Sequence, residues 1–66
     1  MQQLFNKQIY DSECLRKAAE DFSTIAEISL QDNDKNWICI FSRCLNNDEL
    51  TVKEYSNYVL DLMNNK

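Results

Sequence analysis

The stretch AEISLQDNDKNWICIF, residues 26–41, decides the fold. Its first five residues alternate between apolar and polar side chains, which predicts a half-buried strand. WICIF, residues 37–41, is continuously apolar and rich in aromatic and β-branched residues, which predicts a second strand. The polar run QDNDKN between them predicts a turn, because Asn and Asp tolerate tight-turn backbone. We therefore expect the two strands to form a hairpin.

Two further elements precede this hairpin. Residues 3–10, QLFNKQIY, predict a short strand. Residues 12–24, SECLRKAAEDFST, predict a helix that Asp11 caps. Its apolar residues recur at helical spacing and make one stripe: Leu15, Ala18, Ala19 and Phe22.

A final helix follows the hairpin, over about residues 51–63. TVKE reads as a capping box in which Thr51 caps and Glu54 reaches back, and Leu50 with Tyr55 would form the hydrophobic staple. The predicted core stripe of this helix is Val52, Tyr55, Val59 and Leu62. Leu60 and Met63 fall on a second stripe, so we expect some apolar surface to stay exposed there.

The element order β-α-β-β-α predicts one α+β domain spanning residues 1–66. Short loops and right-handed crossovers favour a three-stranded antiparallel sheet of order 1-3-2 with both helices on one face. This is the ferredoxin-like arrangement without its last strand. The first strand then has an open edge, and the second sheet face has no helix to cover it.

Composition excludes several classes of function. The chain has 66 residues and a net charge of −4, so phosphate backbones repel it and nucleic acid is not an expected partner. It has neither a secretory apolar segment nor an apolar run of about 18 residues, so no membrane role is expected. Three cysteines form no disulfide framework and fit a reduced, cytoplasmic setting.

The cysteines predict structure rather than chemistry. Cys39 and Cys44 lie five residues apart, so on a continuous strand they point to opposite faces. Cys14 lies on the first helix, and the chain has no histidine to complete a zinc site. The favoured interpretation is three inert thiols without metal or cofactor. A redox or metal role is the alternative, and it requires bound metal or thiols with a lowered pKa.

Two other candidate sites fail on spacing. Asp32, Asp34 and Asn36 resemble the start of a calcium loop, but its sixth and twelfth positions hold Trp37 and Arg43 instead of Gly and Glu. The sequence also has no nucleophile–base constellation and no Gly-rich phosphate loop. We therefore expect a protein that is not an enzyme.

The third strand has two apolar faces. Trp37 and Phe41 lie on one face, and Ile38 and Ile40 lie on the other. If the helices cover one face, the other is either a docking surface or is shielded by long side chains such as that of Lys7. Both interpretations stay open at this point.

Short motifs over nearly the whole chain give a resemblance to a known family. They are FNK followed by IY (residues 5–7 and 9–10), KAAEDF (17–22), and Glu54, Tyr55 and Asn57 followed by Leu60 and Asp61. In these the sequence resembles the HxsD family, small proteins of the His-Xaa-Ser peptide-modification system. Family members tend to finish with a Leu-Arg-Glu-like tail, whereas this chain ends LMNNK.

The resemblance implies a context rather than a reaction. Such proteins are encoded beside radical SAM enzymes and a short peptide that those enzymes modify, and no catalytic residue carries over. We therefore expect a non-enzymatic accessory protein in maturation of a ribosomally synthesised peptide. Its partner would be the precursor peptide, the radical SAM enzyme, or both.

The open edge predicts how such a partner would bind. A peptide or partner strand would pair with residues 4–9 by main-chain hydrogen bonds, and aromatic residues would anchor it on the bare face. The predicted contact residues are Leu4, Phe5, Lys7, Ile9, Trp37 and Phe41, with Leu60 and Met63 as a second contact. Pairing of the same edge into a homodimer competes with this. The alternative function is a small acidic inhibitor, of phage or antitoxin type, of a basic nucleic-acid-binding protein.

Overall fold

The computed structural model describes residues 1–65. Its elements are β1 (Gln2–Asn6), α1 (Ser12–Asp21), β2 (Glu27–Asp32), β3 (Asn36–Ser42) and α2 (Asp48–Asn64). The order β-α-β-β-α is the predicted one. Neither described helix is long and apolar enough to cross a membrane.

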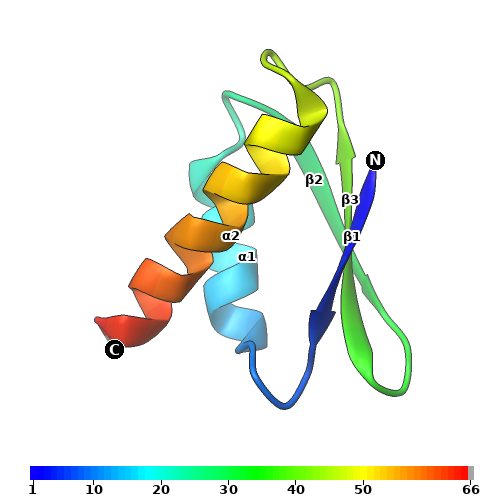
Figure 1. Cartoon of the computed structure of the whole chain (residues 1–66), viewed down its shortest axis with the longest axis vertical. Coiled ribbons are helices and arrows are strands. Elements are labelled where there is room, and N and C mark those ends of the chain that lie inside the picture. Colours follow the sequence, from blue (N-terminus) through cyan, green and yellow to red (C-terminus); the bar gives the residue numbers. More distant parts are fainter. Residues whose placement is uncertain (66) are drawn as a thin grey trace.

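The sheet has β3 at its centre and both neighbours antiparallel to it, in the order β1-β3-β2. Both helices lie on the same side of this sheet (Figure 1). The predicted α+β fold, with strand order 1-3-2 and two helices on one face, is therefore confirmed. It is the ferredoxin-like arrangement without a final strand beside β1.

Tyr55 lies at the centre of the single core, where the two layers meet. Its ring meets those of Phe5, Phe22 and Phe41 at steep angles, with centroids 5.9, 5.5 and 5.3 Å away. Such edge-to-face pairs are favourable beyond the area that they bury. The predicted stripes on the helices are in this core: the buried residues include Leu15, Ala18, Phe22, Val52, Tyr55 and Val59, with Ala19 and Leu62 packed against them.

β1 is shorter than the sequence predicts, because the chain turns at Asn6. The Asn6 carbonyl accepts the N–H groups of both Ile9 and Tyr10, and its side chain accepts the N–H of Gln8. These bonds replace strand pairing with a tight turn that leads into α1. The prediction of a strand through residue 10 is wrong, and Ile9 projects from the turn with 60% of its surface exposed.

α2 begins one turn earlier than predicted. The side chain of Asn47 accepts the N–H groups of Glu49 and Leu50 at 2.8 and 3.2 Å, which makes Asn47 the N-cap. Thr51 is already inside the helix, and its buried hydroxyl donates to the Asn47 carbonyl. The predicted capping box and its staple are therefore wrong, because an equally good cap residue stands four positions upstream.

The position of this cap gives a first prediction. Asn47→Ala removes the acceptor for two helix N–H groups and is expected to lower the free energy of unfolding by about 1 kcal/mol. Glu54→Ala removes the residue that the capping box would have used, and it should change stability by less than about 0.5 kcal/mol. Urea denaturation followed by circular dichroism measures both. A larger loss for Glu54→Ala than for Asn47→Ala would contradict the observed helix start.

The β2–β3 hairpin closes without glycine. The Asn33 side chain accepts the N–H groups of Lys35 and Asn36 at 2.9 and 2.8 Å, and the Asn33 N–H donates to the Asn36 carbonyl. Within residues 1–65 a left-handed backbone occurs only at Arg43, directly after β3. An Asn side chain therefore stabilises the turn that glycine usually makes in hairpins.

Candidate functional site

The outer edge of β1 presents unpaired backbone groups. Met1 and Phe41 exchange two hydrogen bonds, of 2.9 and 2.7 Å, and the Lys7 N–H donates to the Lys35 carbonyl. Directly opposed residues in an antiparallel ladder alternate between bonded and non-bonded pairs. With the observed register, the N–H groups that point away from β3 are therefore those of Gln2, Leu4 and Asn6.

This edge is shorter than predicted and partly occupied. The Asn6 carbonyl is used by the turn described above, and the Leu4 carbonyl lies 3.4 Å from the side-chain nitrogen of Gln3. Ile9 lies beyond the strand, so its predicted place on the edge is wrong. The Phe5 side chain is buried in the core and its backbone groups point toward β3, so neither is open to a partner on this edge.

The outer edge of β2 is a second open edge, which the sequence analysis missed. The bond between the Asn33 N–H and the Asn36 carbonyl shows which residue pairs of β2 and β3 are hydrogen-bonded and which are not. The N–H and C=O groups of Ile28, Leu30 and Asp32 then point away from the sheet. The signal was present in the sequence, because an order of 1-3-2 leaves the second strand as exposed as the first.

The structure decides which face of β3 is buried. Phe41 is only 2% exposed and points toward the helices, as do Cys39 and Trp37, so Ile38 and Ile40 face outward. The prediction that Trp37 and Phe41 anchor a partner on the bare face is therefore wrong. Leu4 is paired with Ile38, and paired residues project to the same face of a sheet, so Leu4 lies on the bare face as well.

Leu4, Ile38 and Ile40 form an outward patch on a face that carries little charge. Its polar residues are Gln2, Asn6, Ser29, Gln31, Asn36 and Ser42. Glu27 also lies on this face, and its carboxylate is 3.1 Å from the guanidinium of Arg43. A partner that meets this face would encounter little of the net charge of −4 that the chain carries.

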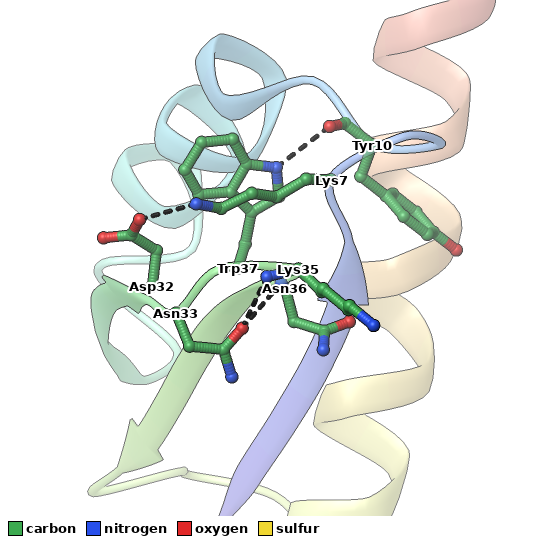
Figure 2. Close-up of polar contacts among 7 residues, drawn as sticks. All are labelled: Lys7, Tyr10, Asp32, Asn33, Lys35, Asn36 and Trp37. Carbon is green, nitrogen blue, oxygen red and sulfur yellow. Dashed lines mark hydrogen bonds and ion pairs between the residues drawn. The ribbon is translucent and has the colours of Figure 1, made fainter.

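Trp37 fastens the β1–α1 connection to the sheet (Figure 2). Its indole N–H donates to the Tyr10 carbonyl at 3.0 Å. The Lys7 ammonium lies 4.6 Å from the centre of the Trp37 ring and 2.7 Å from the Asp32 carboxylate. Lys7 is therefore held between an aromatic face and a carboxylate, and its predicted role in binding would require these contacts to open.

A cavity lies beside the Trp37 ring, between the start of α1 and the end of β2. Its volume is about 160 Å³, and its apolar walls are Leu15, Leu30 and Trp37. Ser12 and Arg16 line it from the helix, and Gln31 and Asp32 line it from β2. Arg16 forms no ion pair with any other described residue.

Leu60 and Met63 lie apart from the sheet residues. Leu60 is exposed on α2, and Met63 is half-buried against the core. α2 belongs to the helix layer, on the other side of the sheet from the patch of Leu4, Ile38 and Ile40 (Figure 1). The structure therefore does not bring these two residues into one site with the patch.

Two of the cysteine thiols, those of Cys39 and Cys44, lie in surroundings that oppose ionisation. Burial raises the pKa of Cys39 to about 11, and it also raises the pKa of the half-buried Cys44, where a hydrogen bond with Asp48 adds to the effect. Cys14 is buried as well. Residues 1–65 contain no group of three metal-binding side chains. Reactive cysteines need the opposite shift, because the thiolate is the nucleophile.

The raised pKa of Cys39 predicts how stability changes with pH. The folded chain holds this proton more tightly than the unfolded chain, whose thiol titrates near 9.0, so stability is unaffected below about pH 9 and falls between pH 9 and 11. The expected loss is roughly 1–2 kcal/mol after allowance for solvent screening. Burial also raises the pKa of Tyr55, which adds to the loss above pH 10.

Urea denaturation at a series of pH values between 8 and about 10.5 measures this effect. Cys39→Ala is the matched variant, because it removes the thiol and should flatten the decline between pH 9 and 10. The same decline in both proteins would show that Cys39 does not cause it.

No protein-family model matches this sequence, and neither the curated proteins nor the solved structures compared with it give a match. The resemblance to the HxsD family therefore stays a prediction.

Proposed function

We propose that this protein is a non-enzymatic binding module that captures an extended peptide by pairing it with an open edge of its sheet. The observation that supports this is the outward row of backbone groups on each outer strand, at Gln2 and Leu4 on β1 and at Ile28 and Leu30 on β2. An extended peptide satisfies such groups with its own main chain, and neighbouring side chains then supply specificity.

The surroundings of these edges suit a peptide better than a small substrate. The patch of Leu4, Ile38 and Ile40 adjoins β1 and bears no charge, so it can cover apolar side chains of a bound strand. Domains of this size rarely build the enclosed pocket that catalysis needs.

The biological setting in this proposal comes from the resemblance to the HxsD family. The bound segment is the precursor of a ribosomally synthesised peptide, and the protein presents it in the cytoplasm to a radical SAM enzyme. A short precursor is itself an unfolded chain, so main-chain pairing can hold it in one extended conformation at the enzyme.

Affinity purification of the tagged full chain from its native host, under reducing and anaerobic conditions, tests the proposal. Mass spectrometry should identify a radical SAM enzyme, a short precursor peptide, or both. Recovery of a basic nucleic-acid-binding protein in their place would overturn the proposal and support the acidic inhibitor.

Two double variants test whether the edges carry the binding. Leu4→Pro with Leu30→Pro removes one outward N–H from each edge, and proline is tolerated at such positions because no ladder bond is lost. Leu4→Ala with Leu30→Ala shortens the same side chains but keeps both N–H groups. The proline pair should recover at least about tenfold less partner than the alanine pair. Equal recovery from two folded proteins would exclude strand addition.

A further inference from the structure

We propose that the peptide pairs with the edge of β2, and that the cavity beside Trp37 binds one bulky apolar side chain of the bound strand. This inference rests on the proposed function and adds to it the edge, the pocket and the chemical class of the residue that is recognised.

The register of β2 points a bound side chain at the cavity. The outward N–H and C=O groups of Leu30 would exchange hydrogen bonds with one residue of an added strand. Directly paired residues project to the same face of a sheet, so that residue projects to the side on which Leu30 lies. This is the helix side, because Leu30 is paired with the buried Cys39. The cavity lies there, between Leu30 and the first turns of α1.

The cavity has the size of one side chain. Its volume is about 160 Å³, close to that of a cavity that accepts a benzene molecule, and it opens to solvent between apolar walls and polar side chains. Leu15 and Trp37 form its inner wall, and Leu30, which is 37% exposed, forms its rim. A leucine or phenylalanine side chain fits this volume and would cover Leu30.

The Trp37 wall is already fixed before any peptide binds. The Tyr10 carbonyl holds the indole N–H, and the Lys7 ammonium lies against the ring (Figure 2). Asp32 holds that ammonium in turn at 2.7 Å. A wall that is ordered in the free protein loses little entropy on binding, which favours affinity.

The charge at the rim selects the neighbours of the recognised residue. The Asp32 carboxylate is compensated by Lys7, whereas Arg16 has no ion-pair partner in the part of the chain that the structure describes. The uncompensated charge at the cavity is therefore positive. We infer that the occupant is an extended segment with a leucine or phenylalanine and an acidic residue two positions away, which projects to the same face.

The edge of β1 offers no comparable pocket. The hollow at its end is lined by polar and charged residues, Asn6, Lys7, Gln8, Asp34 and Lys35. Such a surface does not discriminate between apolar side chains. β1 can bind a main chain, but β2 combines main-chain pairing with a pocket.

Selection from a displayed library of random nine-residue peptides tests this inference with the full chain. Enriched sequences should share a leucine or phenylalanine with an acidic residue two positions away. A synthetic peptide of the enriched sequence should shift the backbone amide signals of Ile28, Leu30 and Asp32 and the indole signal of Trp37 in ¹H–¹⁵N correlation spectra.

Matched variants then locate the site. Leu30→Ser removes the rim of the cavity and should weaken binding about tenfold or more, since burying a leucine-sized group is worth a comparable factor. Leu50→Ser changes a similarly exposed leucine on α2, away from both edges, 49% against 37%, and should weaken binding less than about twofold. Arg16→Glu should reverse the preference for an acidic residue in the bound peptide.

Each other outcome overturns a defined part of the account. Peptides that bind but shift Gln2, Leu4 and Asn6 instead would overturn the choice of β2 and leave the proposed function standing. A library without enriched sequences would contradict the proposed function as well. A dimer whose mass depends on concentration, with the β2 amides already protected, would assign this edge to a second copy of the chain.

Discussion

Replacement of Tyr55 by alanine is expected to remove a large part of the stability of the fold at 25 °C. Tyr55 is fully buried, and three aromatic rings pack edge-on against it. Large-to-small changes of this kind cost about 3–5 kcal/mol. A domain of 66 residues has a total stability of only about 3–10 kcal/mol, at the usual value per residue.

Tyr55→Phe separates packing from hydrogen bonding at the same position. The Tyr55 hydroxyl donates to the Leu15 carbonyl at 2.6 Å and accepts from the Cys39 thiol at 3.8 Å. Phenylalanine keeps the ring and loses these bonds, so a loss of about 1–2 kcal/mol is expected. Urea denaturation followed by circular dichroism measures both variants. An alanine variant that loses less than about 1 kcal/mol would show that Tyr55 is not the centre of the core.

Trp37→Ala is expected to lower the free energy of unfolding by about 2–3 kcal/mol. The substitution removes a half-buried ring, the hydrogen bond to Tyr10 and the surface on which Lys7 rests. The expected loss is below the range for fully buried tryptophan, because part of the ring is exposed to water. The β1–α1 connection should become mobile, and amide exchange at Tyr10 should accelerate.

Trp37→Phe is the matched variant for this prediction. It keeps an aromatic surface under Lys7 but loses the indole N–H, so about 1 kcal/mol should be lost. Denaturation curves of the two variants measure the difference. Unchanged stability in Trp37→Ala would mean that the ring stands free of the connection, as an exposed anchor would.

The strand order was predictable because it depends on local patterns. Alternation in residues 26–30 and the continuous apolar run after the polar turn define the hairpin. A helix connects the first strand to this hairpin, and short right-handed connections then favour the strand order 1-3-2. The open edge of β1 follows from that order alone, and so does the edge of β2.

The buried face of β3 could not be read from the sequence. Alternation separates Phe41 from Ile40 but does not choose between them, because both sets are apolar. The choice depends on tertiary packing: Phe41 meets Tyr55 on α2, whereas Ile40 lies opposite Gln2 and Ser29 on the outside. Period-two patterns predict the faces of a strand, and long-range contacts decide which face is buried.

The cavity beside Trp37 could not be predicted from the sequence, for a related reason. Its walls come from three separate segments, with Leu15 and Arg16 on α1, Leu30 on β2 and Trp37 on β3. No local spacing marks such a set. The early end of β1 was equally hidden, since it depends on a carbonyl of Asn6 that accepts two N–H groups.

Amide hydrogen exchange of the free protein tests the open edges, the central claim of this account, most directly. The N–H groups of Leu4, Ile28 and Leu30 should exchange rapidly, although each lies within a strand. Their neighbours that pair with β3, such as Phe5 and Ser29, should be protected. Protection at Leu4, Ile28 and Leu30 in a dilute, monomeric sample would contradict the account, because those edges would then already be paired.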